Sequence, residues 1–293
     1  MNKQGIAVIG STTIDKIIRG NFSWFKIGGA TAYAGITYSR HGIKTRVVTN
    51  VANRDLEIVR RLQAEQIVVC NGQTAATTYF INYIDGSNQR QKIPQRAKLI
   101  GQSQIIENVK DLSIVHLGPL HASDLDSRVI KLLTNLGLSI VLDAQGLSRS
   151  VKNKSVHPSV SKHLPAFFGI SQIVKANKHE YKSIIDFFEM DLLELLRHFK
   201  INEFVVTAGH SGGFVQTITG EKIQYPATAV KVREDPTGAG DVFLAAYVIG
   251  RYLNRWSIVN SCEYAAKLAA RQIEGNYITP DDLRLLDRKE DQF

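Results

Sequence analysis

The stretch Asp235-Pro236-Thr237-Gly238-Ala239-Gly240-Asp241 decides how the rest of the chain is interpreted. It follows the β-branched run at residues 229–232 and precedes a long apolar segment at residues 242–249, a pattern that predicts a loop feeding the first turn of a buried helix. At a helix N-terminus, backbone N–H groups converge on one point and the helix dipole favours negative charge. The sequence therefore predicts an anion site made by the backbone of Gly238, Ala239 and Gly240.

Asp241 is an unusual neighbour for an anion site, because its carboxylate repels the ligand unless it takes part in chemistry there. An alcohol has a pKa near ~15.7, so full proton transfer to a free Asp with a pKa of ~3.9 would cost about 16 kcal/mol. We therefore expect Asp241 to orient a hydroxyl and to accept its proton late, while a phosphoryl group crosses in a loose transition state. A tight glycine turn capped by an aspartate is the structural alternative.

The composition predicts an ordinary globular protein. The chain has 293 residues, 44% of them hydrophobic and 22% charged, which suits one large domain. Cys70 and Cys262 are its only cysteines and cannot build a disulfide framework, so we expect a reducing, cytoplasmic location. The first residues lack the pattern of a signal peptide, and no apolar run reaches the length of a membrane span.

The net charge of +9 raises the question of nucleic-acid binding. The basic residues are spread thinly, however, and form no stripe with interleaved aromatic side chains. We therefore expect no nucleic-acid partner, and a basic surface that attracts a small anionic ligand explains the charge.

The middle of the chain alternates strand and helix patterns, with strands expected at residues 113–117 and 139–143 and a helix at residues 123–136. Such alternation predicts a mostly parallel sheet with helices on both faces. Ligands of such sheets bind beyond the carboxyl ends of the strands. Arg149, in a loop after the second of these strands, is therefore a candidate phosphate contact, although a lone loop arginine is usually just solvated.

The 235–241 stretch resembles the C-terminal signature of the ribokinase-like (PfkB) carbohydrate kinases, Asp-Thr-x-Gly-Ala-Gly-Asp, with Pro236 where Thr is usual. The resemblance implies a three-layer α/β/α sandwich built as a single domain over residues 1–293. It also implies a small β lid formed from about residues 11–27 and 75–95, with a hairpin turn at 85–88. An edge hairpin of the main sheet is the alternative for the second of these segments.

The same resemblance assigns the acceptor site. In this family an aspartate and a glycine pair hold the sugar hydroxyls, which implies substrate-binding roles for Asp15, Gly28 and Gly29. Tyr33 stands where the family often has Asn, so we expect it at the substrate site and leave the identity of the sugar open. A turn aspartate and a plain strand-to-helix turn are the structural alternatives.

The donor site follows from two further motifs. The segment from Asn177 to Glu180 resembles the family's Asn-x-x-Glu motif, which helps to place Mg²⁺, and it also fits a helix capping box. Thr207, Gly209 and Gly212 match the family's nucleotide loop, and a glycine hairpin is the alternative. The resemblance thus implies ATP and Mg²⁺ as cofactors and leaves open a monovalent cation.

These observations together predict an ATP-dependent kinase that phosphorylates a hydroxyl of a sugar or polyol, with an inositol-like substrate suggested by the wording of several motifs. A nucleoside kinase of the same family and a non-catalytic regulator that binds sugar or nucleotide are the alternatives. A P-loop is absent from the sequence, and Phe243 stands where a dinucleotide fingerprint needs a third glycine. The lid hairpin is also a candidate for pairing between two copies in a homodimer.

Overall fold

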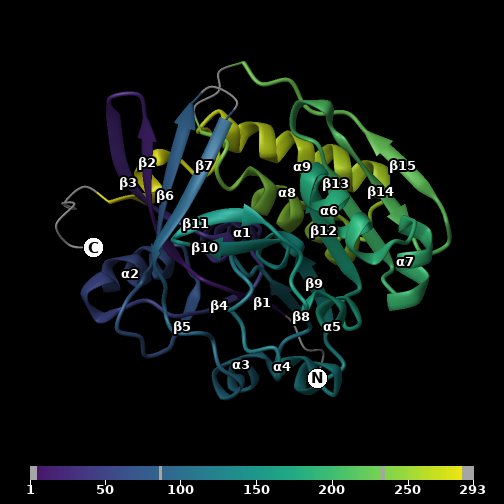
Figure 1. Ribbon diagram of the computed structural model, residues 1–293, viewed down its shortest axis with the longest axis horizontal. Coiled ribbons are helices and arrows are strands. Elements are labelled where there is room, and N and C mark those ends of the chain that lie inside the picture. The colour runs from purple at the N-terminus through teal and green to yellow at the C-terminus, as the bar shows by residue number, and fades with distance from the viewer. Residues whose placement is uncertain (1–4, 86–87, 232–234, 286–293) are drawn as a thin grey trace.

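A nine-stranded sheet forms the centre of the protein. The computed structural model describes residues 5–85, 88–231 and 235–285 (Figure 1). The strand order is β15-β14-β13-β12-β9-β8-β1-β4-β5, parallel from β13 to β5, with β14 and β15 added antiparallel at one edge. Its strands are β1 (Ile6–Ile9), β4 (Thr45–Thr49), β5 (Val68–Asn71), β8 (Ile114–Leu117), β9 (Ser139–Asp143), β12 (Ile173–Asn177), β13 (Glu203–Thr207), β14 (Gly213–Thr217) and β15 (Lys222–Tyr225).

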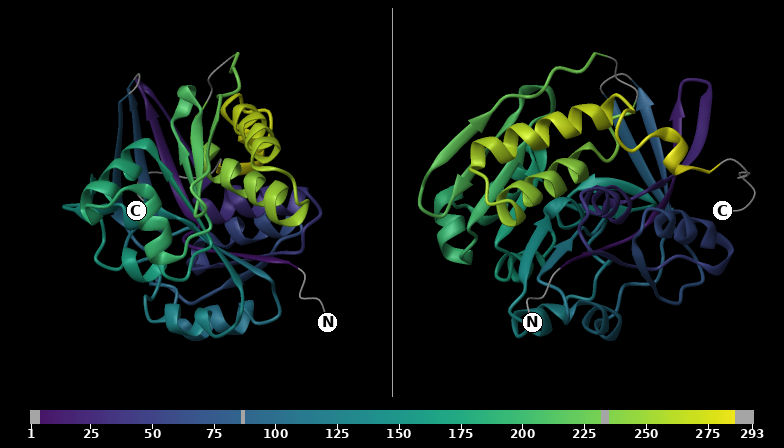
Figure 2. Two further views of the ribbon diagram at one scale, coloured as in Figure 1. Left: turned by 90° about the vertical axis from the view of Figure 1, so that its right-hand side faces the viewer. Right: turned by 180° about the vertical axis from the view of Figure 1, so that it is seen from behind.

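Helices cover both faces of this sheet, because alternate side chains of its strands enter two different cores. Ile6 and Val8 of β1 pack with one set of helices, while Ala7 and Ile9 pack with the other. The two sets lie on opposite sides of the strands in the left view of Figure 2. The first set is α1 (Ala30–Arg40), α2 (Leu56–Ala64), α8 (Ala239–Val248) and α9 (Ile258–Ile273); the second is α3 (Gln102–Val109), α4 (Val129–Thr134), α5 (Leu164–Phe168), α6 (Lys178–Phe188) and α7 (Leu192–Phe199). This arrangement confirms the predicted α/β/α fold.

A second sheet of seven strands, in the order β10-β11-β7-β6-β2-β3-β16, stands beside the carboxyl end of β1, which leads directly into β2 (Figure 1). Segments 11–27 and 75–95, expected to form a lid, supply four of its strands. That the sheet works as a lid stays a prediction. The strands are β2 (Thr13–Arg19), β3 (Phe22–Gly28), β6 (Thr78–Asp85), β7 (Asn88–Gln95), β10 (Arg149–Lys152), β11 (Ser155–Pro158) and β16 (Arg284–Leu285).

Two local predictions differ from the structure. Arg149 belongs to a hairpin, β10–β11, that extends the second sheet by pairing with β7, where the sequence suggested only a loop. The helix expected over residues 123–136 is limited to α4, because the carboxylate of Asp124 accepts hydrogen bonds from the backbone of Ser11 and Leu120 and so fixes the preceding segment as a loop. Of the expected hairpin turn at residues 85–88, Gly86 and Ser87 lie outside the described residues.

Among the described residues, none of the helices combines the length and the apolar character that crossing a membrane demands. The short helix α10 (Pro280–Leu283) leads into β16 and so returns the chain to the second sheet beside β3.

Candidate active site

The predicted anion loop begins helix α8. Gly238 is the residue before the first turn and has left-handed backbone angles, with φ 80° and ψ −8°. A Cβ atom at this position would overlap the ring of Tyr33, so both the backbone angle and the space require glycine. The N–H of Ala239 donates to the carbonyl of Pro236 at 3.3 Å, which closes the turn. The loop therefore presents the start of α8 in a conformation that only glycine adopts without strain.

Asp241 lies in the first turn of α8 and is partly exposed, whereas the apolar residues after it are buried. Burial raises the pKa of Asp241 to about 7, and the nearby Asp143 adds to the effect while Lys175 and Arg149 oppose it. A carboxyl group with a pKa near neutrality is well matched to a general base, since it is largely ionised at working pH and still accepts a proton readily.

Lys175 is a site residue that the sequence analysis missed. Its side chain is 5% exposed, and its Nζ atom lies 2.9 Å from Oδ2 of Asp143. The same Nζ atom is 3.0 Å from the point where Gly240 would carry a Cβ atom, so the ammonium group lies directly against the anion loop. The sequence did carry a signal: Lys175 lies among Ile173, Val174 and Ala176 in strand β12, and a buried lysine needs a carboxylate or an anionic ligand.

Arg149 is buried and bridges two parts of the molecule. Its Nε donates to the carbonyl of Leu120 at 2.6 Å, and one terminal nitrogen donates to Oε1 of Gln91 at 3.1 Å. A hydrogen-bonded chain continues from there along the second sheet, from Gln91 to Asn82 at 2.7 Å and from Asn82 to Asp15 at 3.3 Å. The predicted phosphate contact and the predicted substrate aspartate are thus connected through amide side chains.

Asp15 is 5% exposed and also accepts a hydrogen bond from the hydroxyl of Thr13 at 2.6 Å. Burial raises its pKa, although Thr13 and Lys26 oppose the shift. Its carboxylate lies over Gly28, where a Cβ atom would overlap it, and Gly29 has φ 90° with the carbonyl of Ser11 in the space of a side chain. Gly28 therefore allows a close approach of backbone to the Asp15 carboxylate, and Gly29 allows one to the backbone of Ser11.

Tyr33, predicted at the substrate site, is 1% exposed. Its ring packs against Gly238, and the ammonium of Lys26 lies 5.8 Å from the ring centroid. The structure thus places Tyr33 between the second sheet and the anion loop, and direct contact with a substrate stays a prediction.

The Asn177–Glu180 motif forms the capping box that the sequence allowed. The side chain of Asn177 accepts hydrogen bonds from the backbone of His179 and Glu180, while the Glu180 carboxylate accepts from Asn177. Each carboxylate oxygen of Glu180 thereby receives one hydrogen bond from Asn177 and keeps acceptor capacity. Because Mg²⁺ binds oxygen ligands and retains several waters, this pair fits a metal bound mainly through water. The described residues contain no cluster of three or more Asp, Glu, His or Cys suited to a metal.

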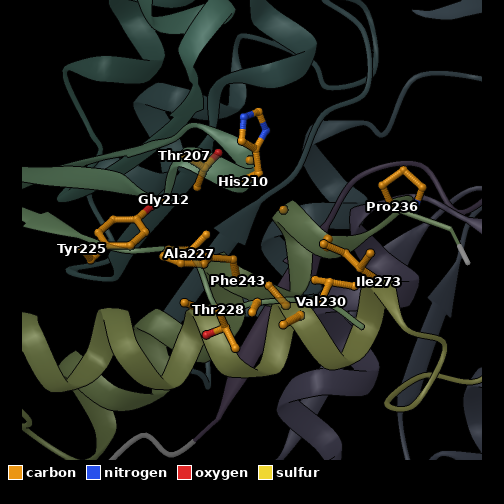
Figure 3. Close-up of a pocket in the computed structure, with 17 residues that line it drawn as sticks. Thr207, His210, Gly212, Tyr225, Ala227, Thr228, Val230, Pro236, Phe243 and Ile273 are labelled. Carbon is orange, nitrogen blue, oxygen red and sulfur yellow. The ribbon is translucent and has the colours of Figure 1, made fainter. Parts of the chain in front are cut away.

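A cavity of about 660 Å³ opens beside the anion loop (Figure 3). Thr207, Gly209 and Gly212 line this cavity together with Ala239 and Gly240. One wall is aromatic, with Tyr225 stacked on Phe243 at a centroid distance of 5.2 Å. The lining residues are Thr207, Gly209, His210, Gly212, Tyr225, Ala227, Thr228, Ala229, Val230, Pro236, Ala239, Gly240, Phe243, Ala266, Ala269, Ala270 and Ile273.

Comparison with known proteins assigns the family. The sequence profile described as pfkB family carbohydrate kinase matches residues 3–279, nearly the whole chain. The chain belongs to the pfkB family. By family it is therefore a kinase, a phosphotransferase, as the 235–241 motif predicted.

One sequence relative and two solved structures show how this pfkB family member compares with individual proteins. A nucleoside kinase of Methanocaldococcus jannaschii is 28% identical over 109 residues, a match that spans 36% of this chain and 35% of that enzyme. A pyrophosphate-dependent kinase of the ribokinase family, solved with a pyrophosphate analog and myo-inositol, superposes with a TM-score of 0.81 at 20% identity, covering 94% of this chain and 98% of that one. Ribokinase of Thermotoga maritima superposes with a TM-score of 0.74 at 16% identity, and the match covers 95% of this chain and 97% of that one.

The geometry of the anion loop predicts a specific effect of Gly238→Ala. The added methyl group meets the Tyr33 ring, and the left-handed backbone becomes strained, so the amides at the start of α8 shift. We expect kcat to fall by about 10²-fold, the usual effect of losing one oxyanion donor. Gly101→Ala is the matched control, because Gly101 has an ordinary φ of −82° and open space around it. Equal activity of the two variants would contradict this account.

The raised pKa of Asp241 predicts a pH profile. Because the ionised form is the active base, kcat/KM should fall as the pH drops through about 7, well above the ordinary value of 3.8. Asp241→Asn should lower kcat by about 10²–10⁴-fold. Its residual rate should lack this acid limb, whereas Asp281→Asn, the same change on an exposed residue of α10, should leave the profile intact. An acid limb that survives in Asp241→Asn would assign the proton to another group.

Proposed function

We propose that this pfkB family member uses a nucleoside triphosphate, ATP, to phosphorylate a hydroxyl of a polyol or sugar. The observation that supports ATP as the phosphate donor is the cavity beside the anion loop. Its side chains are mainly apolar, and none of the described residues that line it is Lys or Arg. Such a surface suits a flat, uncharged base better than a second phosphate, and its volume lies in the usual range for small-molecule sites.

The chemistry follows from the position of the charges. With the base in the cavity, the terminal phosphate reaches the start of α8, where backbone N–H groups and the helix dipole stabilise the charge on the phosphoryl oxygens. Lys175, against Gly240, and Arg149 add positive charge around the same place. Asp241 orients the acceptor hydroxyl and takes its proton late in the transfer. When bound, Mg²⁺ neutralises phosphate charge, and Asn177 and Glu180 would hold it through water.

The acceptor side is polar. Asp15, Asn82 and Gln91 offer carboxylate and amide groups on the second sheet, and such groups pair well with several hydroxyls of one ring. We therefore favour a polyol or sugar, with an inositol-like ring fitting the set. The partial match to a nucleoside kinase supports a nucleoside acceptor as the second candidate. The second sheet acts as a lid over this site in either case, excluding water from the transfer.

An acceptor screen tests the activity. We expect ADP release to rise above background with at least one alcohol in a panel of pentoses, hexoses, inositols and nucleosides, with Mg²⁺ present. When the acceptor is limiting, Asp15→Ala should abolish the rate, because the hydroxyls of the acceptor lose their buried hydrogen-bond partner. Tight binding of a sugar without turnover of any acceptor would instead favour a non-catalytic regulator.

A donor competition tests the base pocket. Ala269 lines the cavity from α9, so Ala269→Phe should fill the space for the base and raise the KM for ATP at least about tenfold, a loss of ~1.4 kcal/mol. Tripolyphosphate, which has no base, should be used no worse than before. Lys267→Phe, an exposed position on the same helix, is the control. Faster turnover with pyrophosphate than with ATP in the unaltered protein would overturn the proposed donor.

A further inference from the structure

Lys26 is a buried lysine that none of the roles above explains. It lies on β3 of the second sheet, and only 8% of it is exposed. Its ammonium group forms an ion pair with Oδ2 of Asp235, the first residue of the 235–241 motif. Lys26 lies directly opposite Asp15, which belongs to the neighbouring strand β2. One cation therefore lies between the acceptor aspartate and the anion loop, on a contact between residues 209 positions apart in the chain.

Asp235 passes this contact on to the loop. Its other carboxylate oxygen, Oδ1, accepts a hydrogen bond from the backbone N–H of Thr237 at 2.9 Å. Its own N–H donates to the carbonyl of Ile273, the last residue of α9, at 3.3 Å. The carboxylate thus fixes the residues immediately before Gly238. If it moves, the turn that presents the start of α8 moves with it.

Both partners are held in their charged forms. Burial lowers the pKa of Lys26, but Tyr33, Asp235 and Asp15 more than offset it, and the net shift is upward. Burial likewise raises the pKa of Asp235, but Lys26 and Thr237 outweigh it, so its pKa lies below the ordinary value. Removing one partner of such a buried pair leaves the other charge without compensation. The pair is therefore sensitive to any change that separates β3 from the loop.

Tyr33 makes the same connection by packing. Its ring packs against Gly238, and the Lys26 ammonium lies 5.8 Å from the ring centroid. A shift of β3 is thereby transmitted to the loop at two points, Asp235 and Gly238. These two points flank the turn on both sides of Pro236 and Thr237.

We propose that Lys26 is a positioning residue that couples the second sheet to the anion loop, so that the amides at the start of α8 reach their working arrangement only when β3 is seated beside Asp235. The inference rests on the proposed function, because it takes those amides to hold the donor phosphate. It adds that the acceptor side and the donor side are linked through one ammonium group. Acceptor hydroxyls that engage Asp15 act next to the same cation.

Kinetics test the coupling. We expect Lys26→Met to lower kcat by about 10²-fold, the effect of a small misplacement of reacting groups, with a much smaller change in the KM for ATP. Lys92→Met, at an exposed lysine on β7 of the same sheet, should leave kcat unchanged. Unaltered kcat in Lys26→Met would overturn the proposal.

A double-mutant cycle separates positioning from general destabilisation. Asp235→Asn should also lower kcat, and the double variant Lys26→Met/Asp235→Asn should lose no more than the worse single variant, because both changes break one connection. It should also melt above Lys26→Met, since no buried charge is left unpaired. Losses that multiply would show that the two residues act independently and would refute the coupling.

Two further measurements complete the test: chemical rescue, which compares one variant with itself, and hydrogen exchange, which does not depend on catalysis. Lys26 and Asp235 line a second cavity of about 370 Å³, so ethylammonium should reach the space left in Lys26→Ala and restore part of kcat, whereas tetramethylammonium should not. Amide hydrogen exchange of residues 235–241 should be faster in Lys26→Met than in the parent protein and unchanged in Lys92→Met. If the parent protein phosphorylates nothing, the proposed function fails, yet this exchange still decides whether Lys26 orders the loop. Equal exchange would refute it.

Discussion

The structure around the start of α8 depends on balancing buried negative charge. Asp235 and Asp241 belong to the 235–241 stretch and Asp143 ends β9, and Glu180 lies close enough to affect the pKa of Asp241. Each additional carboxylate in a poorly solvated place raises the cost of ionising the others. Lys175 forms an ion pair with Asp143, and Lys26 forms one with Asp235. Within the part of the chain that the structure describes, Asp241 forms no ion pair, and burial raises its pKa to about 7.

This balance also separates the two sides of the site. The cavity proposed for the donor has mainly apolar walls, and the positive charges of Lys175 and Arg149 lie near the loop. The side proposed for the acceptor carries hydrogen-bonding amides and a carboxylate that belong to a different sheet. A protein that transfers a charged group between two molecules benefits from such a division, because each partner is recognised by the chemistry that it offers. The anion loop contacts both sides, because Gly238 packs against Tyr33 while Ala239 and Gly240 line the cavity.

The sequence predicted the main fold because the signals were local and regular. The strand and helix alternation of residues 113–143 and the apolar run after Asp241 both have the expected partners in the sheet and cores. The motif at 235–241 led to the correct family. What escaped prediction depends on distant pairing: β10–β11 joins β7 across more than fifty residues, and Lys26 meets Asp235 from the other end of the chain. For the Asn177–Glu180 segment, the sequence predicted both a capping box and a Mg²⁺ site. The structure contains the capping box, and the Mg²⁺ site stays a prediction.

The strand β16 has a consequence for how the protein is made. Arg284 pairs with Lys26 and Leu285 with Phe25, so the outer edge of β3 is covered by some of the last residues of the described chain. During synthesis, this edge of β3 therefore stays open until residues 284 and 285 have left the ribosome. An unpaired strand edge is a template for association with other chains. Contacts of such high sequence separation also form slowly. The growing chain is thus exposed to misassembly along the strand whose lysine forms the ion pair with Asp235.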